Sequence, residues 1–381
     1  MFVEGSIRRS KRVSTSVRGG ILRAMRGGAA TPAQSFAGAD LADSRGLDDA
    51  ASFVVDLLER PAADIRIAEG QLGLADDLVV DGHPDGFPIA PLSPVEPGTV
   101  WAVDGGSCVL ADGRSFQVAA YRAARVRFSE GATDVVESPP LGVRALSRDE
   151  MRRLYLEELE RMACPPPETV PDIGRPVDFL RECAEWREVR DTILAATAGD
   201  LVLVDGSLHG SPLIPAGFVR EVHREAVDRG VLLAGVVKAS TLFWGRNAPL
   251  VTLLKRRGDR ERGAAPWAAR ISTDPAFARL YLGEIFVAHL APTASHAFRV
   301  DVARGPEGPQ EILGRLAGCA GDPAFVGYPY PLARAHQAAR VSGYSVADLR
   351  RAFRSSLADH GMGEDDIETL FQDFHEVLNR S

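Results

Sequence analysis

The sequence of 381 residues contains no long apolar run and few aromatic residues. A membrane-spanning helix needs about 18 or more consecutive apolar residues, and no such stretch is present. The basic N-terminus, residues 1–28, also lacks the apolar segment of a secretory signal. These absences argue against membrane and exported proteins, so we expect a cytoplasmic protein with no membrane partner.

Cysteine is also scarce, with four residues far apart in the chain and no pair at CxxC spacing. Zinc sites and disulfide frameworks both need cysteines in a recognisable pattern. We therefore expect reduced thiols rather than a disulfide scaffold or a zinc site. The four positions are Cys108, Cys164, Cys183 and Cys319.

Charge is unevenly distributed. The whole chain carries −8, whereas the first 26 residues hold seven Lys or Arg against Glu4, which leaves −14 for the remainder. A nucleic-acid coat protein would be basic over its whole surface, so that class is disfavoured. An enzyme that contacts a phosphate backbone locally remains compatible, and a like-charged N-terminal segment is typical of a solvated tail.

Two short apolar segments each end in an acid, glycine and serine. The first is Val100-Trp-Ala-Val-Asp-Gly-Gly-Ser107 and the second is Asp200-Leu-Val-Leu-Val-Asp-Gly-Ser-Leu208. A single Asp-Gly after a strand is usually just a turn. Two near-copies at strand ends favour function, because Asp104 and Asp205 in one sheet could hold a hard metal ion together.

The element order predicts which strands meet. Three antiparallel strands within residues 99–136 precede helices at 147–163 and 177–196 and a fourth strand at 201–205. This is the order of a ribonuclease-H-like sheet, whose first and fourth strands are parallel neighbours. We therefore predict an α/β fold, a mixed sheet with a three-stranded meander and parallel strands, flanked by helices.

The rest of the chain gives the domain prediction: an N-terminal extension (1–95), a core domain (96–345) and C-terminal helices (346–381) that pack on the core or on a partner. Residues 76–97 are expected to be loop, and 255–262 a basic loop that either contacts phosphates or is merely solvated. Further expected helices are 47–59, 216–229, 275–282, 332–341, 345–358 and 363–379, with strands at 231–237 and within 284–302.

The helix at 177–196 offers a third carboxylate. Two-metal phosphoryl chemistry needs an acid beyond a pair of aspartates, and this helix carries Glu182, Glu185 and Glu188. Trp186 and its helical neighbours mark the buried stripe, with Glu185 at the edge of that stripe. Glu185 is the first choice and the other two glutamates stay open, since each could instead be a surface charge.

A last segment, Gly327-Tyr-Pro-Tyr-Pro-Leu-Ala-Arg-Ala-His336, completes a set of motifs. With Asp104-Gly-Gly-Ser107, the glutamate helix, Asp205-Gly-Ser207 and Gly235-Val-Val-Lys238, residues 99–345 resemble the NurA nuclease family. The first turn departs from that pattern by its second glycine, and the first 95 residues have no counterpart in it.

The resemblance implies a manganese-dependent nuclease acting on DNA ends, as a 5′–3′ exonuclease, a single-strand endonuclease or both. It also implies a dimer that works with a HerA-type hexameric ATPase in resecting double-strand breaks. The implied metal residues are Asp104, Glu185, Asp205 and His336, with two Mn²⁺ ions, or Mg²⁺ in their place. Lys238 and Tyr328 would complete the catalytic set.

Three of these side chains, His336, Lys238 and Tyr328, have roles that phosphodiester hydrolysis needs. His336 can ligate a metal or move a proton, and Lys238 can contact a phosphate oxygen. Tyr328 would donate a hydrogen bond or stack on an unpaired base. Tyr328 and His336 also suit plain structural roles in a turn and a helix.

Two other functions fit the same strand-turn motifs. Actin-like and sugar-kinase folds use such turns to hold ATP phosphates, although no adenosine-pocket signature is present. A catalytically idle subunit that docks a helicase is the other alternative. Metal-dependent cleavage of DNA would exclude both.

Overall fold

The computed structural model describes residues 80–112, 116–129, 132–147, 150–245, 248–272, 283–305 and 307–371. The predicted helices at 47–59 and 275–282, and the basic N-terminal segment, lie outside these ranges. The strands are β1 (Ile89–Pro91), β2 (Val100–Asp112), β3 (Phe116–Ser129), β4 (Ala132–Glu137), β5 (Gly142–Ser147), β6 (Leu201–Asp205), β7 (Leu232–Val237), β8 (Phe243–Trp244), β9 (Ala248–Pro249), β10 (Trp267–Ile271), β11 (Gly283–His289) and β12 (Phe298–Ala303). The helices are α2 (Met151–Arg161), α3 (Pro176–Ala195), α4 (Ala216–Asp228), α5 (Leu250–Arg262), α7 (Pro309–Cys319), α8 (Tyr330–Ala339), α9 (Gly343–Asp359) and α10 (Glu364–Phe371). None of these helices is long and apolar enough to cross a bilayer.

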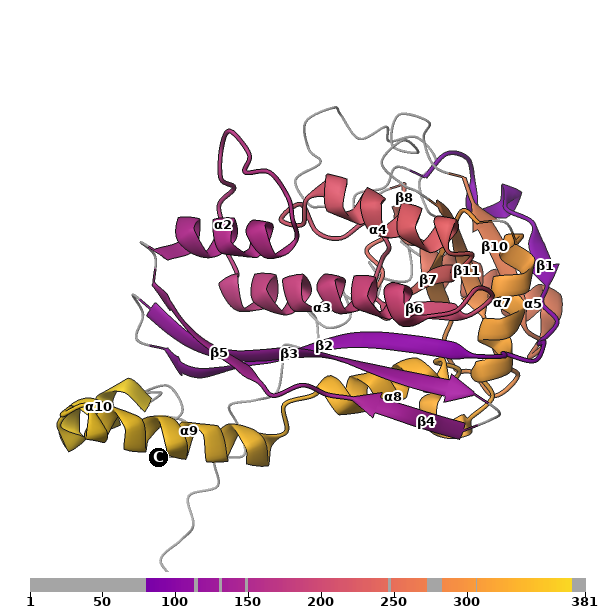
Figure 1. The fold of residues 1–381 in the computed structure, drawn as a ribbon. Coiled ribbons are helices and arrows are strands. Elements are labelled where there is room, and N and C mark those ends of the chain that lie inside the picture. The colour runs from indigo at the N-terminus through magenta and orange to yellow at the C-terminus, as the bar shows by residue number, and fades with distance from the viewer. Residues whose placement is uncertain are drawn as a thin grey trace, which may run out of the picture. The chain divides into compact units, whose positions relative to one another are not determined.

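Ten of the described strands form one mixed sheet (Figure 1). Its order is β1-β10-β11-β12-β7-β6-β2-β3-β4, with β5 paired to β3. The strands β2, β6 and β7 are parallel neighbours, and the other pairs are antiparallel. The predicted adjacency of the first and fourth core strands is confirmed, since Val100 pairs with Leu201 and Val103 with Val204.

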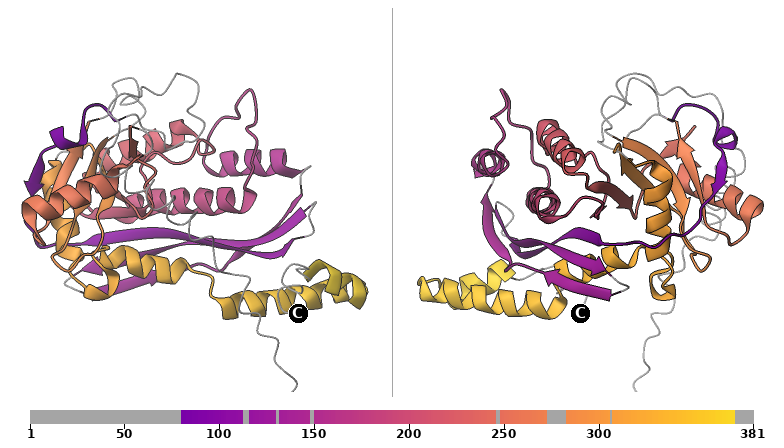
Figure 2. Two further views of the ribbon diagram at one scale, coloured as in Figure 1. Left: turned by 180° about the vertical axis from the view of Figure 1, so that it is seen from behind. Right: turned by 45° about the vertical axis from the view of Figure 1, so that its right-hand side comes forward.

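Helices cover both faces of the parallel strands, with α3 and α4 on one face and α8 on the other (Figures 1 and 2). Alternation along the strands sorts the side chains between the two faces. Ala102 and Leu203 pack in the cluster that includes α8, whereas Val103 and Val204 pack in the cluster that includes α3 and α4. Strands buried on both faces explain why the Leu-Val-Leu-Val run of β6 is wholly apolar.

The basic segment 255–262 is a helix, not the predicted loop. It is the second half of α5, whose Leu250 and Leu254 are fully buried. Ion pairs at i,i+4 spacing link Lys255 to Asp259 at 2.7 Å and Arg257 to Glu261 at 2.6 Å. Such pairs support a helix, which explains why the mixed charge of this segment does not indicate a loop.

The sheet also extends beyond the prediction at both edges. β1 lies within the predicted loop 76–97, pairing Ile89 with Ala269 of β10. β5 and α7 were likewise not predicted. β1 and β5 are short strands whose structure depends on pairing with their neighbours, so their own sequence patterns are weak.

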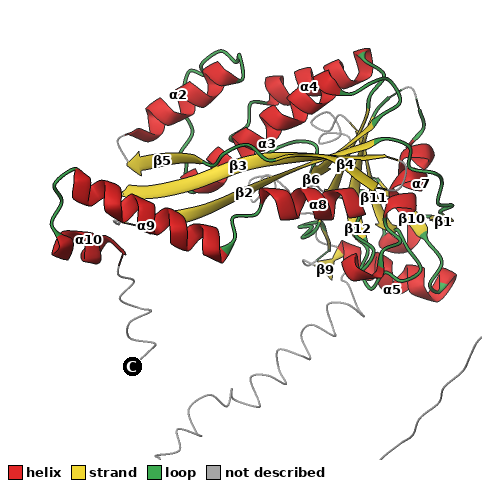
Figure 3. Cartoon of the chain, turned by 60° about the horizontal axis from the view of Figure 1, so that its bottom comes forward, coloured by secondary structure: helices red, strands yellow, loops and turns green. Residues whose placement is uncertain are grey.

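The C-terminal helices lie along the long β2–β3 hairpin (Figure 3). Apolar residues of α9, including Leu349 and Phe353, pack against Leu110 and Val118. Arg350 Nε donates to the Leu110 carbonyl at 3.0 Å. Within the described residues, α9 therefore packs on the β2–β3 hairpin of the core.

Candidate metal centre

Asp104 and Asp205 lie side by side on the central strands. Each is the residue after the last rung of the β2–β6 pairing, Val103 with Val204. Alternation places both on the same face as Ala102 and Leu203, the face covered by α8. Their side chains are 6% and 7% exposed. The two carboxylates therefore converge, as the strand register predicts.

His336 and Lys238 meet this pair of aspartates. His336 Nδ1 on α8 lies 2.7 Å from Asp104 Oδ2. Lys238 follows β7 directly, forms an ion pair with Asp205, and places Nζ 3.4 Å from His336 Nδ1. Ligand atoms of Asp104, Asp205 and His336 all lie within 4.8 Å of one another, so three predicted residues form one cluster that could hold a metal ion.

Tyr328 borders the cluster from a buried position. Lys238 Nζ lies 5.2 Å from the centre of its ring, and the Phe298 ring packs edge-on at 5.4 Å. Burial, and then the charge of Asp205, raises the pKa of the Tyr328 phenol well above its ordinary value, so the hydroxyl stays protonated. With 8% of the residue exposed, the ring offers no face to a base. This buried position favours hydrogen bonding by the hydroxyl over stacking of the ring on a base.

Glu185 approaches the cluster from the opposite face of the sheet. It is 5% exposed, and its Oε2 accepts from Arg181 at 2.8 Å. A Cβ at position 105 would lie 2.9 Å from the same Oε2, so glycine is what lets the carboxylate reach the strand end. Burial, opposed by Arg181 and reinforced by Asp104 and Asp205, raises the pKa of Glu185 well above its usual range.

The other two glutamates of α3 have different partners. Glu182 accepts from the Ser211 amide at 2.6 Å and from the Ser211 hydroxyl at 2.5 Å. Glu188 lies 3.4 Å from Arg125 Nε. Of the three candidates, Glu185 is therefore the one placed beside the aspartates.

The electrostatic environment of Asp104 suits a bound cation. Burial, and then the charge of Asp205, raises the pKa of Asp104 to about 6, against the lowering effects of Lys238 and His336. Holding two buried carboxylates together disfavours their ionised forms, and a divalent cation between them reverses that effect. Carboxylates with one imidazole are a donor set that first-row divalent ions accept.

Sequence reasoning missed the residues that hold α8 in place. The Ala339 carbonyl lies 2.1 Å from where a Cβ at position 106 would be, which explains the second glycine of the first turn. Arg122 Nε donates to the same carbonyl at 3.1 Å, and Ser138 Oγ donates to the Ala338 carbonyl at 3.0 Å. The Gly105-Gly106 pair was the signal, since a second glycine suggests a close approach of backbone.

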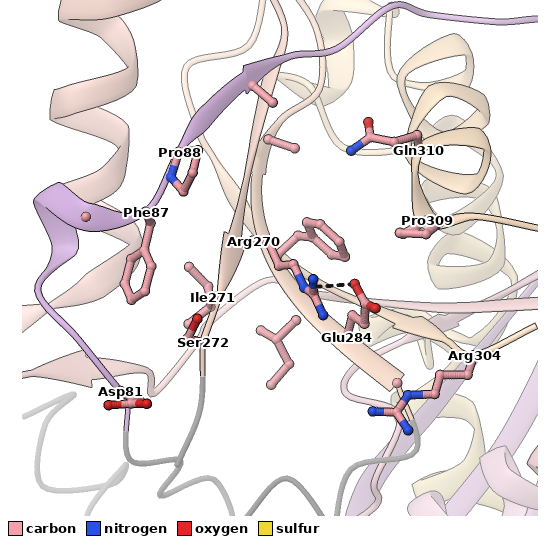
Figure 4. A pocket seen from close by; sticks show the side chains of 16 residues that line it. Asp81, Phe87, Pro88, Arg270, Ile271, Ser272, Glu284, Arg304, Pro309 and Gln310 are labelled. Atoms are coloured by element: carbon pink, nitrogen blue, oxygen red, sulfur yellow. Dashed lines mark ion pairs between the residues drawn. The ribbon is translucent and has the colours of Figure 1, made fainter. Parts of the chain in front are cut away.

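A separate cavity of about 890 Å³ opens beside β1, β10, β11 and the start of α7 (Figure 4). Arg270 and Glu284 form a 3.0 Å ion pair on its wall. None of the six predicted site residues lines it. Its volume therefore gives no support to the predicted site, which rests on the clustered side chains instead.

Comparison with known protein families finds a related domain within this chain. Residues 98–242 match the family model of the NurA domain. This part of the chain is similar to the NurA domain. The match includes Asp104, Glu185, Asp205 and Lys238 and ends before Tyr328 and His336. The resemblance to the NurA nuclease family predicted from the motifs is confirmed.

One solved structure shares the fold over most of this chain, and two others match more weakly. The NurA nuclease from Sulfolobus solfataricus is 15% identical over 82% of this chain and 95% of its own, with a TM-score of 0.53. Endonuclease V of Ciona intestinalis (11% identity, 82% and 100% coverage, TM-score 0.34) and the human endonuclease V catalytic domain (12%, 83% and 99%, 0.33) also match. No curated protein sequence matches the chain. The predicted α/β fold, a mixed sheet flanked by helices with its first and fourth core strands parallel, is confirmed. The NurA match of residues 98–242 supports a nuclease.

Proposed function

We propose that this protein is a divalent-metal-dependent nuclease that hydrolyses DNA phosphodiesters. The observation that carries the proposal is the convergence of Asp104 and Asp205 on one face of parallel neighbours, with a ligand atom of His336 within 4.8 Å. Three elements far apart in the sequence thus bring oxygen and nitrogen donors to one point. The NurA domain supports the same activity.

Asp104, Asp205 and His336 would hold a divalent ion, and Glu185 would flank it from α3. Two such ions, Mn²⁺ or Mg²⁺, would generate the nucleophile from water and neutralise charge on the phosphate. The buried position of Glu185 and its raised pKa fit this role, because a second cation would stabilise its ionised form.

The remaining side chains act on protons and on the phosphate. His336 Nδ1 faces Asp104 Oδ2, and an imidazole held by a carboxylate is oriented for ligation or proton transfer. Lys238, 42% exposed at its side chain, would contact a non-bridging phosphate oxygen as a point charge. The protonated hydroxyl of Tyr328 would donate a hydrogen bond at the inner edge of the site.

The finer assignment follows the NurA resemblance. DNA ends would be the substrate, cut as a 5′–3′ exonuclease, as a single-strand endonuclease or both, in the resection of double-strand breaks. A homodimer would act with a HerA-type hexameric ATPase in the cytoplasm. The supporting facts are the NurA domain and a fold shared with a NurA nuclease.

Cleavage of end-labelled linear DNA tests the proposal. The purified protein is assayed with Mn²⁺, Mg²⁺ or EDTA, beside Asp104→Ala and the control Asp112→Ala at the far end of the same strand. We expect metal-dependent degradation by the wild type and the control, and none by Asp104→Ala.

No cleavage with either metal would contradict the proposal and favour the idle-partner alternative. Adding a HerA-type ATPase and ATP would then decide whether the activity depends on the complex. ATP hydrolysis by the protein alone would favour the kinase-like alternative.

A further inference from the structure

A buried ion pair lies on β12, which is separated from the strand that carries Asp205 by β7. Arg299 is fully buried and Asp301 is 3% exposed. Arg299 Nε donates to Asp301 Oδ1 at 2.8 Å, and its Nη2 donates to Oδ2 at 2.9 Å. Replacing such a pair by apolar residues of similar volume is often neutral or stabilising. Stability therefore does not explain why two charges lie in this core.

Asp301 has a second contact, to the turn that follows Asp205. Its Oδ2 accepts from the buried Leu208 amide at 3.2 Å. Asp301 pairs in register with Gly235 of β7, and a Cβ at 235 would lie 2.4 Å from the Gly206 carbonyl oxygen. The missing side chain lets the turn lie flat across β7 and reach Asp301.

Two further backbone groups of the same turn also have hydrogen-bond partners. The Leu208 carbonyl faces His223 Nε2 of α4 at 3.1 Å, and the Gly206 amide donates to the Val236 carbonyl at 3.1 Å. Gly206 has φ +147°, a conformation that side chains disfavour. Glycine allows this backbone conformation. Asp301 of β12 then supplies a second contact from the sheet to the turn, beside that of Val236.

We propose that Arg299 and Asp301 are positioning residues that hold the 205–208 turn and so aim the Asp205 carboxylate at its cation. The inference rests on the proposed function. Arg299 orients the Asp301 carboxylate with two parallel hydrogen bonds, and Asp301 fixes the Leu208 amide. Asp205 lies three residues before Leu208, and its side chain is on the opposite face of the sheet from Asp301. Arg299 and Asp301 therefore contact no substrate or metal themselves.

The double variant Arg299→Met/Asp301→Leu tests this role, because it removes both charges together and places apolar side chains in the core instead. We expect the variant to fold and to unfold at a somewhat lower temperature than the wild type, because the buried Leu208 amide loses its acceptor. Hydrogen exchange at the Leu208 amide should accelerate at least ~10-fold, and affinity for Mn²⁺ alone, measured by calorimetry, should fall by about 10–100-fold, as when a ligand loses its supporting contact.

Asp200→Asn is the matched control. Asp200 is a buried carboxylate at the other end of β6 that also accepts from a turn amide, that of Thr197 at 3.1 Å. It should leave Mn²⁺ affinity within about 2-fold, since mutations far from a site are usually independent of it. A folded double variant with wild-type Leu208 exchange and Mn²⁺ affinity would overturn the inference.

Two further measurements cover the cases in which the double variant does not fold or the wild type is inactive. If the double variant does not fold, exchange in the wild type decides: a protected Leu208 amide supports the anchoring, and rapid exchange there overturns it. A wild type that neither binds Mn²⁺ nor cleaves DNA would contradict the proposed function, whereas loss of both properties in the double variant alone supports the inference.

Discussion

The carbonyl oxygen of Ala339 fills the space that a side chain at position 106 would need, 2.1 Å from the position of its Cβ. Gly106 lies two residues beyond Asp104 on the same face of β2, and Ala339 is the last residue of the helix that carries His336. The absence of a side chain at 106 therefore sets how closely His336 approaches Asp104.

Gly106→Ala should displace α8 and separate His336 from Asp104. Overpacking of this kind costs about 1–3 kcal/mol, and we expect a matching fall in the free energy of unfolding together with weaker Mn²⁺ binding. Denaturant unfolding and calorimetry measure the two effects. Gly217→Ala is the control, because that helical glycine has open space around it; it should stabilise the protein by about 0.5–1 kcal/mol. Unchanged Mn²⁺ affinity in Gly106→Ala would contradict the expectation.

Asp205→Asn should abolish nuclease activity while the fold survives. The substitution keeps the size of the side chain but removes a charge that the proposed cation needs, so the loss should exceed the ~10–100-fold typical of outer contacts. Cleavage rates and circular dichroism are measured together. Retained metal-dependent cleavage by the folded variant would remove the central claim.

The three glutamates of α3 should separate in one mutational series. Glu185→Gln should lower cleavage by at least ~100-fold, as a metal-site residue, and Glu188→Gln should change it by less than about 2-fold, because that side chain faces Arg125. Glu182→Gln should mainly destabilise the 206–211 loop, whose Ser211 it binds. Cleavage kinetics with Mn²⁺ rank the variants, and equal losses in all three would argue against the assignment.

The same series predicts a change in stability. The pKa of the Glu185 carboxyl is higher in the folded protein than in the unfolded chain. The protonated carboxyl therefore favours folding, and this contribution to stability is lost as the pH rises above the pKa of the unfolded chain. In EDTA at pH 7–8, Glu185→Gln should therefore be more stable than the wild type, because the glutamine carries no charge that burial disfavours. Thermal unfolding with EDTA measures this, and a less stable variant would show that the Arg181 pair outweighs burial.

Stability should also depend on His223 at mildly acid pH. Burial lowers the pKa of His223, against the raising effects of its bond to the Leu208 carbonyl and the charge of Asp301. As the pH falls, the unfolded chain therefore takes up a proton on this histidine before the folded protein does. The stability that neutral His223 contributes is fully present above the unfolded pKa of ~6.5 and declines as the pH falls below it.

His223→Gln keeps a donor for the Leu208 carbonyl but cannot titrate. Its unfolding free energy should therefore vary less with pH between about 5 and 7 than that of the wild type, by roughly 1.4 kcal/mol for each pKa unit of the shift. Urea unfolding across this range gives the two slopes. Parallel profiles would show that His223 is not the titrating group.

The sequence by itself determined the strands that end in Asp104 and Asp205 and their parallel adjacency, because apolar runs and glycine turns are local signals and the ribonuclease-H order follows from them. It also marked the α3 segment and the Tyr328–His336 segment. It did not reveal β1, β5, α7 or the helical nature of residues 255–262, whose structure depends on packing and ion pairs with neighbours.

Tertiary structure alone decided the rest of the site. A helical wheel places Glu182, Glu185 and Glu188 around one face, but Gly105, on a strand some 80 residues earlier in the sequence, gives Glu185 its path to the aspartates. The approach of Ala339 to Gly106 and the contact of Asp301 with the Leu208 amide likewise join segments separated by 233 and 93 residues. Close packing sets such distances, and a local pattern carries no information about a partner that far along the chain.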